Sequence, residues 1–406
     1  MLSTPHYVVL DTNIVLHQID LLESEGLNNV IIPITVILEV ENRSSTVYER
    51  LKAILADKKR NFYVFNNEHR KETYIERLPG ESRNDRNDRA IRVACKWYRG
   101  HLQEASDTKG LEVVMVTDDV KNWELGNEEG IKSFSLEAYV KGMKNFPDLI
   151  DKINRKEDSV SQNKNKNILF PEHLSQAQIS AGIKTGKYKQ GVFYLSRNNF
   201  LEGSVNIEGR EPVLLHGLES MNRAVDGDTV AIEILQEKEW TAPAEVVLVD
   251  DGYDPGDTLE KDKKLLDGAA KSKDVQCTGK VVGIIKRKGR QYCGRIKPHY
   301  YIPNKRATQH LFVPTDKKIT KVLIETTQAK VLANQKIIVK IDSWPRTSLY
   351  PTGHFVRALG KQGEWVTRVV KLGDGGGRLD RTRSRLARQR SFDERRGRRR
   401  NTFTPH

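Results

Sequence analysis

Short, wholly hydrophobic runs alternate with segments of helical periodicity over roughly the first 150 residues. The runs are rich in Val, Ile and Leu, as interior parallel strands are, and the segments between them carry hydrophobic residues every three or four positions. This alternation predicts an α/β domain with a mostly parallel sheet. We expect its strands over 7–10, 30–34, 62–65, 111–116 and 131–134, and its helices over 14–22, from 35 onwards, 48–58, 88–102 and 136–143.

A different pattern follows the polar stretch at 154–167. Short strands are now separated by turn signals such as Asp226-Gly227-Asp228, which predicts two small five-stranded barrels. A faint repeat supports two related units, because 228–234 aligns with 335–341 and a Trp follows each. The expected strands are 191–195, 201–205, 213–215, 230–234 and 246–249 in the first barrel, and 279–285, 292–296, 311–314, 322–325 and 336–341 in the second.

These patterns predict an order of domains and linkers. The last segment, an Arg-rich tail without hydrophobic periodicity, is expected to be disordered. From Arg378 to Arg400 it holds 11 Arg and 3 acids, a net +8, which leaves only +6 of the total +14 for the rest. The folded part is therefore mildly basic, and charge alone argues weakly for nucleic acid. The expected boundaries are an α/β domain at 1–153, a linker at 154–185, a first barrel at 186–250, a flexible linker at 251–274, a second barrel at 275–374 and the tail at 375–406.

The sequence contains no stretch long and apolar enough to span a membrane, and its first residues lack the features of a signal peptide. We expect a soluble intracellular protein with no membrane partner. Cys95, Cys277 and Cys293 are odd in number and widely scattered, so neither a disulfide framework nor a CxxC zinc site is indicated.

Four acids stand at or near the ends of predicted strands. Asp11 directly follows the first strand, Asp119 closely follows the strand at 111–116, Glu39 lies early in a helix after another strand, and Asp88 follows a polar loop at 79–87. Such strand ends border the ligand-binding crevice of α/β sheets. Gathered carboxylates are tolerable when a divalent cation neutralises them, and oxygen ligands favour Mg²⁺ or Mn²⁺. The alternative is a set of helix caps and solvated surface acids, since Asp is a favourable N-cap.

The motifs Asp11-Thr12-Asn13, Glu39, Asp88 and Thr117-Asp118-Asp119 resemble the four-acid signature of PIN-domain ribonucleases. The resemblance implies that Asp11, Glu39, Asp88 and Asp119 bind Mn²⁺ or Mg²⁺ and catalyse endonucleolytic cleavage of RNA. It selects Asp119 over Asp118, and Asn13 would orient a ligand or the phosphate. More narrowly, the chain resembles the catalytic ribonuclease subunits of eukaryotic RNA exosomes, of the RNase II/RNB family, at 5–7, 16–20, 66–70, 72–74, 84–93 and 138–141.

Both predicted barrels combine aromatic residues on strands with basic neighbours, as single-stranded RNA-binding barrels do. Each aromatic residue could instead belong to the barrel core. This alternative does not apply to the cationic residues in a turn. The region also resembles the two cold-shock (OB-fold) domains of the same family, at 222–225, 281–287, 344–346 and 350–357. Candidate RNA-binding residues are Tyr194, Arg197, Phe200, Arg287, Lys288, Arg290 and Tyr292.

The resemblance implies further expectations. The partners would be single-stranded RNA and the core ring subunits of the exosome. The protein would be located in the nucleus, including the nucleolus, and a possible further location in the cytoplasm is part of the same expectation. In the family a docking segment precedes the PIN domain and a 3′-to-5′ exonuclease domain follows the second barrel. The likeness ends at Asp374, so we expect this chain to lack both. The tail beyond it would bind RNA, act as a nuclear address, or reflect a frame shift or an incomplete gene model. The alternative function is a non-catalytic RNA-binding and exosome-docking fragment.

Overall fold

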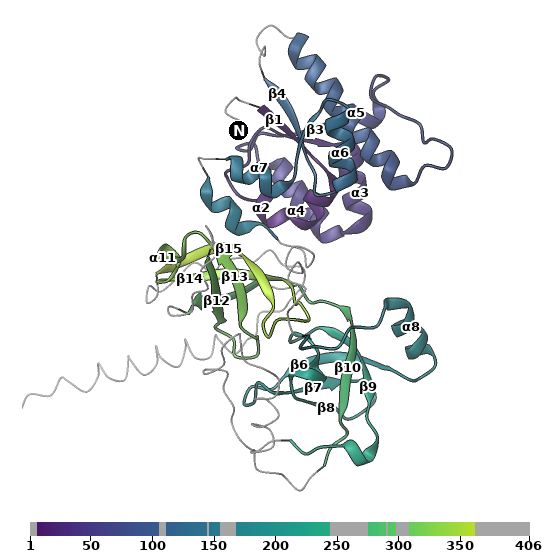
Figure 1. Ribbon diagram of the computed structural model, residues 1–406, viewed down its shortest axis with the longest axis vertical. Coiled ribbons are helices and arrows are strands. Elements are labelled where there is room, and N and C mark those ends of the chain that lie inside the picture. The colour runs from purple at the N-terminus through teal and green to yellow at the C-terminus, as the bar shows by residue number, and fades with distance from the viewer. Residues whose placement is uncertain are drawn as a thin grey trace, which may run out of the picture. The chain divides into compact units, whose positions relative to one another are not determined.

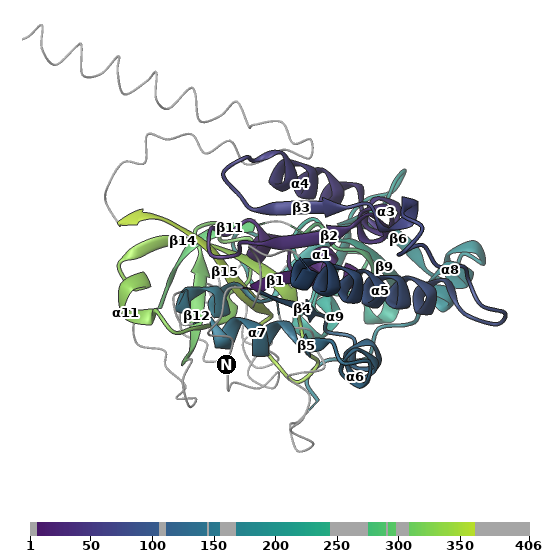
Figure 2. The same ribbon diagram turned by 90° about the horizontal axis from the view of Figure 1, so that it is seen from above.

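Five parallel strands form the sheet of the first domain in this computed structural model, and helices surround it (Figure 1). The structure describes residues 6–104, 111–143, 146–154, 168–243, 275–289, 291–297 and 308–361. The strand order is β3-β2-β1-β4-β5, which Figure 2 shows in sequence across the sheet, and every pairing is parallel, so the predicted α/β domain is confirmed. The strands are β1 (His6–Leu10), β2 (Val30–Pro33), β3 (Phe62–Phe65), β4 (Glu112–Val116) and β5 (Lys132–Phe134).

The centre of this sheet is fully buried because its strands present apolar side chains on both faces. Val8 and Val9 of β1 have no exposed surface, and all of β2 is buried. Leu10 pairs with Val116, so β1 and β4 end side by side. The residues that follow these two strands must therefore meet at one edge of the sheet.

The helices of the first domain differ from expectation at three points. The predicted helix at 14–22 is divided at Gln18, α5 begins at Arg83 inside the predicted polar loop, and α6 was not predicted. Within the described part of the chain, no helix is long and apolar enough to cross a membrane. The helices are α1 (Thr12–His17), α2 (Ile19–Leu22), α3 (Ile34–Arg43), α4 (Ser45–Ala56), α5 (Arg83–Glu104), α6 (Val120–Glu128) and α7 (Leu136–Gly142).

A second five-stranded sheet, of antiparallel pairs, has the order β10-β9-β6-β7-β8. It corresponds to the predicted first barrel and keeps that name below; a single bridge between Leu214 of β8 and Thr278, just before β10, links its two edges. Its fifth strand is β10, which we had expected in the second barrel; that assignment was wrong. We assigned β10 to the second barrel because it is close in sequence to the strands of that barrel, but it pairs with β9. The strand predicted at 246–249 lies outside the described residues. The strands are β6 (Lys189–Leu195), β7 (Glu202–Asn206), β8 (Val213–His216), β9 (Thr229–Ile234) and β10 (Gly279–Lys286).

The third sheet is a closed barrel of order β11-β12-β13-β15-β14 around a core that contains Phe312, Val322 and Val339. Strand β15 was not predicted. It pairs with β14 through several register shifts and with β13 in parallel, so contacts distant in sequence define it. The strands are β11 (Gln291–Ile296), β12 (Thr308–Pro314), β13 (Val322–Thr326), β14 (Gln335–Ser343) and β15 (Thr352–Lys361).

Short helices accompany the barrels. Helix α8 (Gln176–Lys184) lies in the region predicted as a linker, begins with a Ser175 capping box and packs against β10, where a Cβ on Gly283 would come within 2.5 Å of Ile179. Helix α9 (Leu218–Met221) belongs to the first barrel and α11 (Ala329–Leu332) to the second. The C-terminal part of the predicted linker at 154–185 therefore contains a helix.

Candidate active site

Asp11 lies where β1 ends, and only 2% of its surface is exposed. Its Oδ2 atom accepts hydrogen bonds from Thr117 Oγ1 (2.5 Å), Asn13 Nδ2 (3.0 Å) and Asn122 Nδ2 (3.1 Å). Its Oδ1 atom accepts one from the backbone N–H of Thr12 (2.6 Å) at the start of α1. Asp11 therefore both caps a helix and stands at the edge where β1 and β4 meet. Burial raises the pKa of this carboxyl, and Asp119 adds to the rise, although the hydrogen bonds oppose it.

Glu39 reaches the same edge from α3, the helix that follows β2. Its Oε2 atom accepts from Thr12 Oγ1 (2.9 Å) and from Asn87 Nδ2 (3.2 Å). Its Oε1 atom lies 2.6 Å from Nη2 of Arg43, one turn further along the helix. The Glu39 side chain is 12% exposed and that of Arg43 is 48% exposed, so the guanidinium stands on the solvent side of the carboxylate.

Asp88 lies in the second turn of α5, where the charges of the other three acids act on its carboxyl. Burial raises the pKa of Asp88 to about 7, and the negative charges of Asp11, Asp119 and Glu39 add to the rise. Arg92 opposes it from the next turn of the helix. A carboxyl whose pKa is raised by burial together with three other acids marks a candidate functional site.

Asp119 and its neighbour Asp118 have different surroundings. Asp119 is the N-cap of α6 and accepts from the backbone N–H of Asn122 (2.9 Å). Asp118 instead accepts from the backbone N–H of Leu136 (3.0 Å), while its own N–H donates to Asn13 Oδ1 (3.2 Å). Asp118 thus fixes the start of α7, and Asp119 is the one whose charge acts on Asp88.

The sequence did not reveal the polar side chains that hold the acids in place. The buried guanidinium of Arg92 donates to Asn122 Oδ1 (2.7 Å) and to Glu129 (2.9 Å), and Asn122 in turn donates to Asp11. The sequence did contain a weak signal for these residues, because each polar residue that holds an acid in place is next to an acid in the sequence or follows one by three or four positions. The residues missed are Thr12, Asn87, Arg92, Thr117 and Asn122.

The acids are gathered but not converged on a single point. Within the described residues, no three His, Cys, Asp or Glu side chains form a ready-made metal site. The hydrogen bonds explain this, since Asp11 accepts from four donors and Glu39 faces Arg43. The chemistry of the set nevertheless fits a hard divalent cation, which prefers carboxylate oxygens. A cation would also relieve the repulsion that, after burial, adds to the rise in the pKa of Asp88.

The candidate RNA-binding residues of the first barrel are accessible. Tyr194 lies on β6 with 37% of its surface exposed. Arg197 is exposed and Phe200 is half-buried in the loop after β6, and both line a pocket. Their role in binding RNA remains a prediction.

The candidates after β10 are more strongly tied to the fold. Arg287 Nη1 donates to the buried Asp228 carboxylate (2.7 Å), and the backbone N–H of Lys288 donates to its other oxygen (3.0 Å). Tyr292 is half-buried against the core of the second barrel, which is the core alternative considered for aromatic residues. Arg290 lies outside the described residues. RNA binding by these four residues also stays a prediction.

Comparison with known protein families gives three matches in chain order. Residues 8–137 match the PIN domain, residues 167–264 the Rrp44-like cold shock domain, and residues 309–371 the Dis3-like cold-shock domain 2. The predicted order of one PIN domain and two cold-shock domains is confirmed.

Several curated proteins are similar along most of the chain. The exosome complex exonuclease RRP44 of Mus musculus is 46% identical over 91% of this chain and 39% of its own length. The RRP44 homolog A of Arabidopsis thaliana is 36% identical over 91% of this chain and 42% of its own. A solved T. brucei RRP44 PIN domain is 30% identical with a TM-score of 0.32, covering 34% of this chain and 79% of that one. The chain spans about two fifths of the length of these curated relatives.

Proposed function

We propose that this chain, which is homologous to the RRP44 exosome exonucleases and contains a PIN domain followed by two cold-shock domains, is a divalent-metal-dependent endoribonuclease that binds single-stranded RNA. The observation that carries the proposal is the shared electrostatic environment of Asp11, Glu39, Asp88 and Asp119 at one edge of the PIN sheet. The names of its relatives support a place in an exosome complex. We further propose the core ring subunits of the exosome as partners and RNA processing and decay as the process.

The four carboxylates would hold Mn²⁺ or Mg²⁺. When bound, the metal supplies an activated water and neutralises charge on the scissile phosphate. Asn13, Thr117 and Asn122 fix the orientation of Asp11, and Thr12 and Asn87 do the same for Glu39. The protein thereby keeps the acids in place against their mutual repulsion.

Cleavage of circular single-stranded RNA tests the proposal, because a circle has no end for an exonuclease. With Mn²⁺ the wild type should linearise the circles, and Asp88→Asn or Asp119→Asn should lower the rate by roughly 100-fold or more. Asp118→Asn is the matched control, since Asp118 anchors α7, and it should cut at nearly the wild-type rate. Intact circles with the wild type, or full activity in Asp88→Asn, would leave the non-catalytic RNA-binding function as the better explanation.

The location of the protein is a separate part of the proposal. We propose the nucleus, including the nucleolus, with a share in the cytoplasm. Fluorescence imaging of the tagged chain checks this, and exclusion from the nucleus would contradict it.

A further inference from the structure

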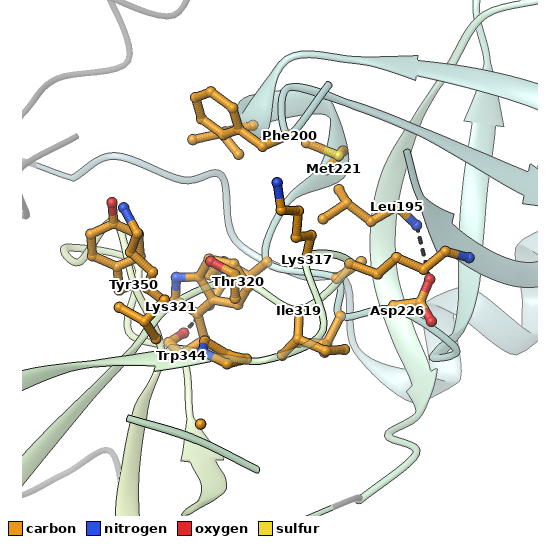
Figure 3. A pocket seen from close by; sticks show the side chains of 18 of the residues that line it. Leu195, Phe200, Met221, Asp226, Lys317, Ile319, Thr320, Lys321, Trp344 and Tyr350 are labelled. Atoms are coloured by element: carbon orange, nitrogen blue, oxygen red, sulfur yellow. Dashed lines mark hydrogen bonds between the residues drawn. The ribbon is translucent and has the colours of Figure 1, made fainter. Parts of the chain in front are cut away.

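The cold-shock region contains a pocket of about 550 Å³ to which both barrels contribute (Figure 3). The first barrel supplies residues from the end of β6, the following loop and α9, and the second supplies the turn between β12 and β13 and the segment before β15. Figure 3 shows the Lys317 side chain between Phe200 and Met221 on one side and Ile319 and Trp344 on the other. Neither barrel forms this pocket alone.

Much of the pocket wall is apolar and contains flat rings. Phe200 contributes from the first barrel, and Trp344 and Tyr350 from the second. Trp344 is fixed in place, because its Nε1 donates to the carbonyl of Ser348 (3.1 Å) and its ring meets Phe170 edge-on at 6.0 Å. Rigid aromatic walls of this kind bind planar unsaturated groups such as nucleobases by stacking and burial.

The charged groups of the pocket favour an anion. Arg197 and Lys317 are exposed and Lys318 is half-buried, and no ion pair ties any of the three to another residue in the described ranges. Lys321 is buried with its ammonium 5.8 Å from the Tyr350 ring. Among the described lining residues the one carboxylate is Asp226, which already accepts from the backbone N–H of Leu195 (3.1 Å).

We propose that this pocket binds one unstacked nucleotide of single-stranded RNA and is shared by the two barrels. The base lies against the apolar wall that includes Phe200 and Tyr350, and Arg197, Lys317 and Lys318 bind the phosphates beside it. The inference rests on the proposed function and gives it a location. RNA is then held by the two cold-shock domains acting as one unit rather than by two independent faces.

Fluorescence anisotropy with a labelled 12-nucleotide RNA tests the proposal on the full chain, with Asp88→Asn as background and EDTA present so that no RNA is cut. Phe200→Ala should weaken binding about tenfold at every salt concentration, because a stacking surface is lost. Lys317→Gln/Lys318→Gln should also weaken binding and reduce the slope of log affinity against log salt by about 1, because fewer phosphates are neutralised.

Lys330→Gln is the matched control, since Lys330 is an exposed lysine of the second barrel that does not line the pocket. It should bind as the background protein does, and thermal unfolding should show that all variants remain folded. Unchanged binding by both pocket variants would overturn the proposal, as would equal affinity for adenosine monophosphate and for the RNA. The circle-cutting assay is independent: lost cutting with normal pocket effects contradicts only the endonuclease proposal.

Discussion

The Asp88 carboxyl gives the candidate site a pH dependence near neutrality. Its pKa is about 7 in the folded protein and ordinarily 3.8, so between these values the folded state holds a proton that the unfolded chain has lost. Stability therefore falls as pH rises from about 4 to about 7 in the protein without metal. A cation binds the deprotonated form, so its affinity rises over the same range.

We expect the affinity for Mn²⁺, measured by isothermal titration calorimetry, to increase by about tenfold in all between pH 6 and pH 8, with most of the rise below pH 7. Asp88→Asn is the control and should bind Mn²⁺ more weakly with a flatter pH profile. A wild-type affinity independent of pH over this range would contradict the coupling of Asp88 to the other acids.

The guanidinium of Arg43 competes with a metal ion for Glu39, since it lies 2.6 Å from Oε1 of that carboxylate. Arg43→Gln should therefore tighten Mn²⁺ binding by roughly two- to fivefold, the range for a half-exposed charge. Lys141→Gln, which breaks the similarly spaced pair with Glu137 on α7, should leave the affinity unchanged. Weaker Mn²⁺ binding in Arg43→Gln would mean that Arg43 helps to position Glu39 instead.

The sequence predicted the four acids of the candidate site but not the polar side chains that hold them in place. Asp11 stands out because it ends a hydrophobic run, and Asp119 does so nearly as clearly. Asn122 was missed because its hydrogen bond to Asp11 joins residues 111 positions apart, and no local sequence pattern around either residue indicates that the two are in contact.

Helix α5 places Asp88 in the site, and its first turn determines that placement. Ser82 precedes the helix and accepts from the backbone N–H of Asp85 (3.0 Å), which is the bond of an N-cap. Ser82→Ala should lower the free energy of unfolding by about 1 kcal/mol and also weaken Mn²⁺ binding. Ser44→Ala removes the cap of α4 and should affect stability alone. Equal Mn²⁺ affinity in both variants would show that α5 holds Asp88 without its cap.

The first barrel needs β10, which lies beyond the connection at 244–274. A fragment of residues 168–289 should therefore give a cooperative thermal transition by circular dichroism. A fragment ending at residue 274 should not, because β9 would keep β6 but lose β10 and Val281 would leave the core. A cooperative transition in the shorter fragment would contradict the five-stranded sheet.

Local pattern accounts for the elements that were predicted, and strand pairing for those that were not. The hydrophobic runs of β1, β2 and β4 are visible in the sequence because both faces of these strands are buried. The ladder between β10 and β9 and the pairing of β15 with β13 depend on residues far apart in the chain. Alternation within a strand says nothing about which strand lies beside it.

At the scale of the whole molecule, a buried charge cluster joins the PIN domain to the second barrel. Asp20 of α2 accepts from Lys340 Nζ (2.7 Å) and from Arg50 (2.8 Å), and His354 Nε2 lies 3.6 Å from it. His354 Nδ1 forms a hydrogen bond with Oδ1 of Asp342 (2.7 Å). Burial alone would lower the pKa of His354, but the carboxylates of Asp20 and Asp342 raise it to about 9.

The contribution of His354 to stability depends on pH in a definite direction. Because its folded pKa of about 9 exceeds the ordinary 6.5, the protonated form stabilises the fold fully below about pH 6.5, and the effect is lost as pH rises through 9. His354→Gln should therefore lower the melting temperature more at pH 6 than at pH 9.5. The difference corresponds to at most roughly 3 kcal/mol.

His173→Gln is the matched control, because burial lowers the pKa of His173 to about 4 and it stays neutral over the whole range. Its effect on the melting temperature should be slightly smaller at pH 6 than at pH 9.5, the opposite direction from His354→Gln, because the unfolded chain takes up a proton on His173 near its ordinary pKa of 6.5. An equal loss at pH 6 and pH 9.5 in His354→Gln would show that His354 is neutral and contributes only packing. The negative charge of Asp20 would then be balanced by Lys340 and Arg50 alone, and the contact between the PIN domain and the second barrel would not respond to pH.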